Sequence, residues 1–159
     1  CGNLDIRIAR DGTWYYLGSP IGRIELVKLF SSILRKDEDK YFLVTPAEKV
    51  GIKVDDAPFV AVDFSVVGNG KNQTLIFETH VGDTVKLNKE NPLRVTIDQN
   101  SGEPKPYIHI RSGLEALIDR KSFYRLIELC SIKTHNKEEW FGICSNKKFF
   151  PIILASELS

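Results

Sequence analysis

Apolar and polar residues alternate at the start of the chain and then change to a helical spacing. Residues 4–9, LDIRIA, alternate strictly, and Asp11-Gly12 before TWYYL predicts a tight turn and the second strand of a β-hairpin. Ser19-Pro20 then supplies an N-cap and a first-turn proline. The helix predicted after it has about four turns. Its apolar stripe consists of Leu26, Leu29, Phe30 and Ile33, widened by Val27 and Leu34.

Short strands dominate the middle of the chain. The charge run RKDEDK at 35–40 is expected to be a solvated helix end and turn, and YFLVT after it a buried strand. From 50 to 111, alternating segments separated by turns such as GNGKNQ and NSGEPKP predict an antiparallel meander. LEALIDRKSFYRLIELC then predicts a second amphipathic helix, and WFGIC and FFPII predict closing strands. The apolar face of that helix is made of Phe123, Leu126, Ile127 and Cys130.

The order strand, helix, strand therefore occurs twice. LVKL at 26–29 and LIEL at 126–129 occupy matching places in the two helices, and an aromatic pair opens the strand after each. Two amphipathic helices can also look alike by chance, so duplication and coincidence both remain open. We expect an α+β fold with two related halves. An N-terminal hairpin, helix and strand would occupy residues 1–49, and a larger antiparallel sheet with one helix residues 50–159.

Composition and charge exclude some classes of protein. The chain has 159 residues, 42% of them apolar, enough for one ordinary domain or two very small ones. Its net charge of +1 does not favour duplex nucleic acid as a partner. No apolar run approaches the roughly 18 residues of a membrane span, so no membrane partner is expected. The three cysteines, Cys1, Cys130 and Cys144, form no C-x-x-C pair, which indicates a reducing, cytoplasmic location.

No motif for nucleophilic, zinc or dinucleotide chemistry occurs in the sequence, and no cofactor or metal is expected. Asp55 and Asp56 could form a carboxylate pair, but neighbouring strand residues point to opposite faces. Their expected role is turn chemistry through bonds to nearby backbone N–H groups. A metal trio of Asp63, Glu78 and His80 is a weaker candidate, because such residues also form the polar solvent face of a sheet.

Arginines supply the more informative candidate site. Arginine is the residue best suited to bidentate binding of phosphate or carboxylate, and aromatic rings beside it could stack on a ligand. The alternative is four ordinary surface ion pairs, since the chain has 21 acidic residues. The candidate ligand-binding residues are the arginines Arg23, Arg94, Arg111 and Arg120 and the aromatic residues Trp14, Tyr107 and Phe149.

Several longer runs carry a resemblance. DGTWYYLGSPIGRIELVKLF, LRKDEDKYFLVTPAEKVGIKVDDAPFVAV and PYIHIRSGLEALIDRKSFYRLIEL, with the later CSNKKFFPI, resemble the bacterial DUF1285 family of unknown function. The resemblance covers nearly the whole chain and is most specific at TPAEK and DDAPF. It implies a duplicated α+β core whose C-terminal half is superficially similar to a pleckstrin-homology fold. It also implies a ligand groove between the halves for a nucleotide-like molecule, a signalling role and no established activity.

Three functions remain as hypotheses. The first is a non-enzymatic module that binds a small anionic, nucleotide-like ligand between the halves. The second is a protein-interaction module that accepts a partner peptide at a sheet edge by strand addition. The third and weakest is a metal-dependent hydrolase that uses the trio of Asp63, Glu78 and His80.

Overall fold

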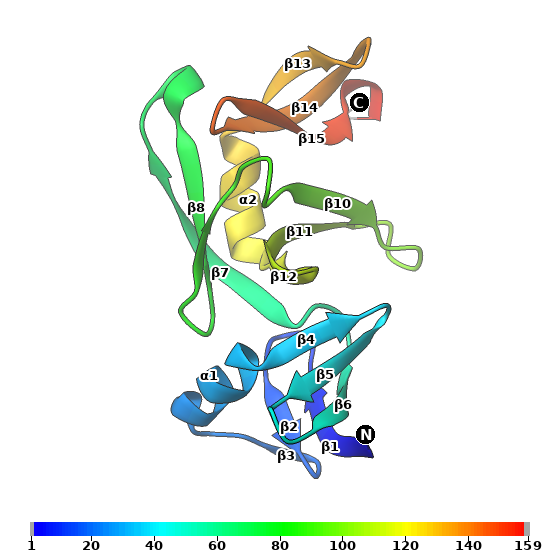
Figure 1. The fold of residues 1–159 in the computed structure, drawn as a ribbon. Helices are drawn as coiled ribbons and strands as arrows, with labels where there is room; N and C mark the ends of the chain where they lie inside the picture. The colour runs from blue at the N-terminus through cyan, green and yellow to red at the C-terminus, as the bar shows by residue number, and fades with distance from the viewer. Residues whose placement is uncertain (1, 158–159) are drawn as a thin grey trace.

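The computed structural model describes residues 2–157, which form an α+β fold of three sheets and two α-helices. Figure 1 shows the first sheet at the bottom, the second in the middle and the third at the top. The first sheet has the strand order β3-β2-β1-β6-β5-β4. Its strands are β1 (Gly2–Ile8), β2 (Trp14–Tyr16), β3 (Ser19–Pro20), β4 (Leu34–Asp37), β5 (Lys40–Val44) and β6 (Lys49–Val54).

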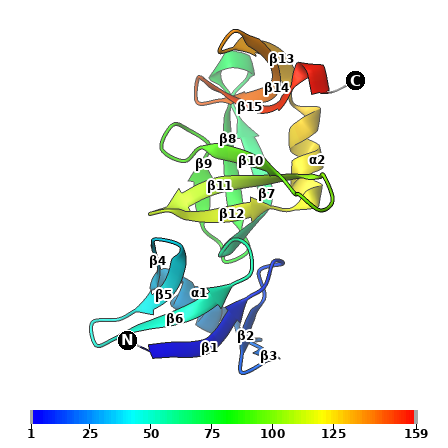
Figure 2. The ribbon, with the colours of Figure 1, turned by 90° about the vertical axis from the view of Figure 1, so that its right-hand side faces the viewer.

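The second sheet also has six strands, in the order β10-β11-β12-β7-β8-β9, and the third has the order β13-β14-β15. Helix α1 (Ile24–Ser32) belongs to the N-terminal part, and α2 (Arg120–Glu128) connects the second and third sheets (Figure 2). The strands are β7 (Phe59–Val67), β8 (Thr74–Thr79), β9 (Thr84–Lys86), β10 (Leu93–Ile97), β11 (Pro104–Arg111), β12 (Leu114–Ile118), β13 (Ser131–His135), β14 (Glu138–Ser145) and β15 (Lys148–Leu154).

The two six-stranded sheets share one topology. Each sheet consists of two three-stranded antiparallel meanders. The first and sixth strands of the sheet pair in parallel and join the two meanders, β1 with β6 in the first sheet and β7 with β12 in the second. The order of three strands, one helix and three strands also occurs twice, around α1 and around α2. The prediction of two similarly built halves is confirmed for the sheets, whereas the helices differ in place: α1 lies between the third and fourth strands of the first sheet, and α2 follows the sixth strand of the second. The expected boundary between the two halves falls after residue 49. In the structure β6 pairs with β1 and β5, so the first sheet continues to Val54.

The predicted N-terminal hairpin is present. Ile6 and Ile8 on β1 and Trp14 on β2 point into the core and are buried. The Asp11 carboxylate accepts a hydrogen bond from the Thr13 backbone N–H at 3.0 Å. Gly12 adopts φ +91°, a value that side chains with a Cβ rarely reach. The turn residues therefore close the hairpin in the register that buries its apolar face.

The first helix is shorter than predicted, and it buries only part of the predicted apolar face: Phe30 and Ile33 pack against the core. Ser19 and Pro20 pair with β2 as strand β3, so they cannot begin a helix, and α1 starts at Ile24. The helix buries Val27 and Ser31, whereas Leu29 of the predicted stripe is 58% exposed. Residues 35–40 are exposed and include the predicted turn, but the expected helix end is wrong, because β4 and its turn into β5 occupy this segment. β4 lies at the edge of its sheet, where charged side chains are well tolerated.

The second helix is also preceded by a strand that the pattern does not predict. LEALI forms β12, and α2 begins one residue after Asp119, whose carboxylate caps the helix by accepting from the Ser122 N–H at 2.9 Å. The predicted apolar stripe is confirmed, with Phe123 and Leu126 buried. The parallel pair β7–β12 at the centre of the sheet replaces the predicted simple meander. Three strands follow α2, so the topology does not support the pleckstrin-homology comparison.

One core cluster connects all three sheets. It includes Trp14 from the first sheet, Phe77 and Ile108 from the second, and Ile143 and Phe150 from the third. The third sheet is attached through Ser145, whose buried hydroxyl accepts from the Leu75 N–H at 2.9 Å and donates to the Leu87 carbonyl at 2.6 Å. Within residues 2–157, no helix has the length and apolar character needed to cross a membrane.

Candidate functional site

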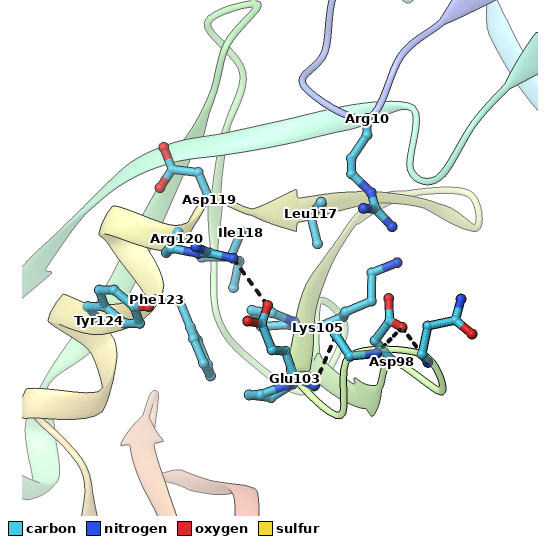
Figure 3. A pocket seen from close by; sticks show the side chains of 14 residues that line it. Arg10, Asp98, Glu103, Lys105, Leu117, Ile118, Asp119, Arg120, Phe123 and Tyr124 are labelled. Carbon is cyan, nitrogen blue, oxygen red and sulfur yellow. Dashed lines mark hydrogen bonds and ion pairs between the residues drawn. The ribbon is translucent and has the colours of Figure 1, made fainter.

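A pocket of about 610 Å³ lies where the β10–β11 hairpin, β12 and the start of α2 meet. Figure 3 shows Arg10 reaching toward it from the β1–β2 turn of the N-terminal half. Its apolar surface comes from Leu117 and Ile118 on β12 and from the rings of Phe123 and Tyr124 on α2. Pockets of this size commonly hold small-molecule ligands. The polar lining includes Arg10, Asp98, Asn100, Ser101, Glu103, Lys105, Asp119 and Arg120.

The acidic groups in this lining already have partners. Asp98 accepts from the backbone N–H groups of Asn100 and Ser101 at 2.8 and 3.1 Å, and these bonds hold the pKa of its carboxyl below the usual value. Asp119 caps α2. The Glu103 carboxylate accepts from the Arg120 guanidinium at 3.1 Å, an exposed contact. These carboxylates therefore shape the pocket and hold its walls in place.

Three cations face the same space. Besides Arg120, Lys105 Nζ lies 3.0 Å from Asp56 Oδ2, and Arg10 Nε lies 3.5 Å from the same oxygen. The side chain of Arg10 is 63% exposed and that of Arg120 is 70% exposed, so both can change rotamer at little cost. Arg120 can therefore turn toward an anion without breaking a buried contact, whereas Arg10 would leave the largely buried Asp56 carboxylate, which still has Lys105 beside it.

Asp56 links the pocket to the joint between the halves. Its Oδ1 accepts a hydrogen bond from the buried Tyr107 hydroxyl at 2.7 Å. Burial, followed by this bond, raises the pKa of the Tyr107 hydroxyl far above its usual value, so Tyr107 remains a neutral donor. Asp55 instead pairs with Arg7 on β1. Both residues lie in the bend after β6 and not on a strand, so strand alternation does not explain why their partners differ. Asp55 and Asp56 form ion pairs in place of the predicted turn bonds to the backbone.

The structure distributes the seven predicted ligand-binding residues over several places. Arg94 and Tyr107 lie together, with the guanidinium 4.5 Å from the ring centroid, and Arg94 also pairs with both oxygens of Glu115. Trp14 is 1% exposed and packs against Phe30, so its ring cannot reach a ligand. The others separate as follows: Arg120 lines the large pocket, Arg111 lines a second cavity, Arg23 is exposed before α1, and Phe149 packs beside His135 in the third sheet.

Sequence reasoning missed several residues of the pocket. Arg10 directly precedes the Asp11-Gly12 turn, and Lys105 lies between two prolines at the start of β11. Phe123 was assigned to the core face of its helix, where it also lines the pocket. The available signal was a basic residue beside a hairpin turn, since surface loops and turns often carry binding residues.

The weaker metal hypothesis gains no support from the geometry. Asp63 and Glu78 face each other across β7 and β8, but Asp63 is bonded to Arg125, which lowers the pKa of the Asp63 carboxyl. The His80 Nδ1 accepts from the Val60 N–H at 3.3 Å. Among residues 2–157, no group of three His, Cys, Asp or Glu side chains is arranged to hold a metal ion.

His80 is expected to make the stability of the folded chain depend on pH. Burial is the main cause that lowers its pKa below the usual 6.5. The unfolded chain therefore takes up this proton near pH 6.5, while the folded chain takes it up only at lower pH. As pH falls from 7.5 to about 5, the free energy of unfolding should decrease, because the unfolded state binds more protons. Urea titrations at the two pH values should show this slope, and His80→Gln should flatten it. An equal slope in His80→Gln would assign the effect to other groups.

Of the two described cysteines, Cys130 behaves as an inert residue at the end of α2. Burial raises the pKa of its thiol to about 12, and its Sγ lies 3.2 Å from the Leu126 carbonyl oxygen. Cys144 Sγ lies 3.0 Å from Lys133 Nζ. Both are free thiols. Cys1 is outside the described residues.

The sheets and the pocket define an α+β protein with an N-terminal and a C-terminal unit. The chain belongs to the DUF1285 family. The model described as "Domain of unknown function (DUF1285), N-terminal domain" matches residues 1–57, and "Protein of unknown function (DUF1285), C-terminal domain" matches residues 58–152. The division after residue 57 falls between β6 and β7, in agreement with the sheets. No curated protein matches the chain.

Two crystal structures of family members are similar to this one. A DUF1285 family protein from Silicibacter pomeroyi DSS-3 is 57% identical with a TM-score of 0.93, over 99% of this chain and 84% of that one. A DUF1285 family protein from Shewanella baltica OS155 is 29% identical with a TM-score of 0.61, over 77% of this chain and 90% of that one. These relatives support the fold and the family and describe no activity.

Proposed function

We propose that this protein is a non-enzymatic module that binds a small anionic, nucleotide-like ligand in the pocket of about 610 Å³. The observation that carries the proposal is the combination of exposed cations with aromatic side chains around one cavity. Arg10 and Arg120 would hold the negative charge, and Phe123 or Tyr124 would contact the ring. The acids of the lining are bound to backbone N–H groups or to Arg120, so they do not serve as general bases in this proposal.

A ligand in this position would contact both halves of the chain. Arg10 comes from the N-terminal unit, and the rest of the lining comes from the C-terminal unit. Arg10 and Lys105 both lie close to Asp56, in the segment that joins the units. Ligand binding would therefore change contacts at the joint, which suits the proposed signalling role. We also propose a cytoplasmic location, because free thiols such as Cys130 and Cys144 are typical of reducing compartments.

A thermal-shift screen against nucleotides and phosphorylated metabolites tests the proposal. A ligand that binds the folded state raises the unfolding midpoint at saturating concentration. Arg120→Ala and Arg10→Ala should each weaken the affinity of a hit about tenfold, the effect of losing one charge-assisted hydrogen bond worth about 1.4 kcal/mol. Arg23→Ala is the matched control, since Arg23 is exposed and does not line the pocket. Hits that bind both pocket variants as tightly as wild type would rule this pocket out.

The second candidate function is strand addition at β13. This strand lies at the edge of its sheet with most of its residues exposed, including Ile132 at 54%. An extended peptide could pair with that edge through its main chain. A module of this kind would show no midpoint shift with the small-molecule panel, which distinguishes it from the first proposal.

A further inference from the structure

A second cavity, of about 470 Å³, lies between α1 and the second sheet. Lys28, Ser31 and Ser32 line it from α1, and the β8–β9 turn and the end of β11 line it from the other half. It shares no lining residue with the larger pocket. Any ligand bound here would therefore be recognised by different side chains.

Arg111 is the most unusual residue of this cavity. Five of the eight arginines have a carboxylate of the described residues within 4.0 Å, and Arg23, Arg35 and Arg111 are the other three. Within residues 2–157, Arg111 has no carboxylate in that range. Its Nη2 donates to the Ser31 carbonyl at 2.6 Å, and its guanidinium lies 5.5 Å from the centre of the Phe59 ring. Its Nη1 is buried and has no hydrogen-bond partner among the described residues.

A buried guanidinium nitrogen without a partner is costly, because it has lost water and gained no acceptor. An oxyanion would satisfy it, since the planar fork of arginine matches phosphate and carboxylate oxygens. The partner of Nη1 must be a hydrogen-bond acceptor, because a guanidinium group has only donors. Arg111 therefore indicates the chemical class of a missing partner.

Lys28 supplies a second cation from the opposite half. Its Nζ lies 3.8 Å from the position that a Cβ would occupy on Gly82, which places the amino group beside the β8–β9 turn. It forms no ion pair with the carboxylates of the described residues. Lys28 and Arg111 thus bring two positive charges from different units to one cavity.

The remaining polar groups limit how an anion could be held. The hydroxyls of Ser31 and Ser32 donate to the carbonyls of Lys28 and Leu29 at 2.9 and 2.6 Å, so they are not available as donors. Thr84 provides a further hydroxyl in the lining, and Asp83 is its single carboxylate. Two cations against one acid leave the lining with one net positive charge.

We propose that this cavity binds a small oxyanion with a phosphoryl group, held between Arg111 and Lys28. The group can be free phosphate or the phosphoryl end of a larger metabolite. Because Lys28 belongs to the N-terminal unit and Arg111 to the C-terminal unit, the bound anion connects α1 to the second sheet. This site is independent of the nucleotide-like ligand proposed for the larger pocket.

The test compares inorganic phosphate with methyl phosphate, using chloride of equal ionic strength as the reference. Calorimetric titration should detect binding in wild type. Lys28→Ala should weaken it about tenfold through the lost charge contact, and Arg111→Lys, which keeps the charge but loses the fork, should weaken it by a similar factor. Asp83→Asn should tighten binding several-fold, because it removes the opposing charge. Arg120→Ala serves as the control from the larger pocket and should bind like wild type.

Each result of these titrations either supports or overturns the proposed site. Phosphate binding that is lost in Lys28→Ala supports the site, and a preference for methyl phosphate identifies the phosphoryl end of a metabolite as its source. Absence of binding by either anion at tens of millimolar, or equal binding in Lys28→Ala and wild type, overturns it. Lys28 is exposed, so its variant should fold even if Arg111→Lys does not. Loss of binding in Arg120→Ala alone would assign the anion to the larger pocket.

Discussion

Asp56→Ala is expected to lower the free energy of unfolding by about 3 kcal/mol, while Asp55→Ala should lower it by less than about 1 kcal/mol. The Asp56 side chain is 13% exposed and accepts from the buried Tyr107 hydroxyl at 2.7 Å, with Lys105 Nζ 3.0 Å away. Its removal leaves the Tyr107 hydroxyl without its acceptor and the Lys105 ammonium group without its counter-charge in a largely buried place. Asp55 pairs with Arg7 at the surface, where water replaces the lost partner.

Urea denaturation of the two variants measures this difference between adjacent aspartates. Tyr107→Phe in the wild-type and Asp56→Ala backgrounds completes a double-mutant cycle for the hydroxyl bond. A coupling energy of about 1 kcal/mol or more is expected, since hydrogen bonds to charged groups exceed neutral ones. Equal stabilities of Asp55→Ala and Asp56→Ala would show that the Asp56 contacts do not hold the joint together.

Gly142→Ala is expected to lower the free energy of unfolding by about 3 kcal/mol or more. Gly142 lies on β14 opposite Pro151 of β15, and a Cβ there would come within 2.9 Å of the Pro151 Cα and would also collide with the Phe150 carbonyl oxygen. Both obstacles are backbone atoms, which cannot rotate away as a side chain could. The β14–β15 pair would separate locally and disturb Ser145, which anchors the third sheet to the second.

Gly22→Ala is the matched control for this prediction. Nothing lies within 4 Å of a Cβ at Gly22, and its backbone does not have the positive φ that favours glycine. Its stability should equal or slightly exceed that of wild type, because alanine reduces the entropy of the unfolded chain. Thermal unfolding followed by circular dichroism compares the two variants. A Gly142→Ala protein as stable as Gly22→Ala would mean that β14 and β15 can shift apart at no cost.

The local parts of the fold could be predicted because short-range interactions govern them. The N-terminal hairpin depends on the Asp11-Gly12 turn and on strict alternation, and both are visible in the sequence. The apolar stripe of α2 was predicted for the same reason, since Phe123 and Leu126 repeat at helical spacing. Each of these features depends on residues that are close together in the chain.

Predictions failed where a distant segment decided between two local possibilities. LEALI has a pattern that fits a helix or a strand, and parallel pairing with β7, far earlier in the chain, makes it β12. Ser19-Pro20 is a good helix start, but pairing with β2 makes it β3. In α1, Val27 and Phe30 pack toward the core, so that Leu29 remains exposed although it belongs to the same apolar pattern. Propensity is a weak prior that tertiary contacts override.

The candidate sites show the same division between local and distant causes. The chain alone specified an α+β protein with a repeated strand-helix-strand order and the residue types suited to anion binding, because hydrophobic period, turn chemistry and side-chain charge are properties of short segments. Only the tertiary structure decided that Arg10 joins Arg120 around one pocket, that Arg111 and Lys28 line another, and that Trp14 is buried in the core. These groupings arise from parallel strand pairing and from packing between the units. Both unite residues far apart in the chain, and no local pattern encodes that proximity.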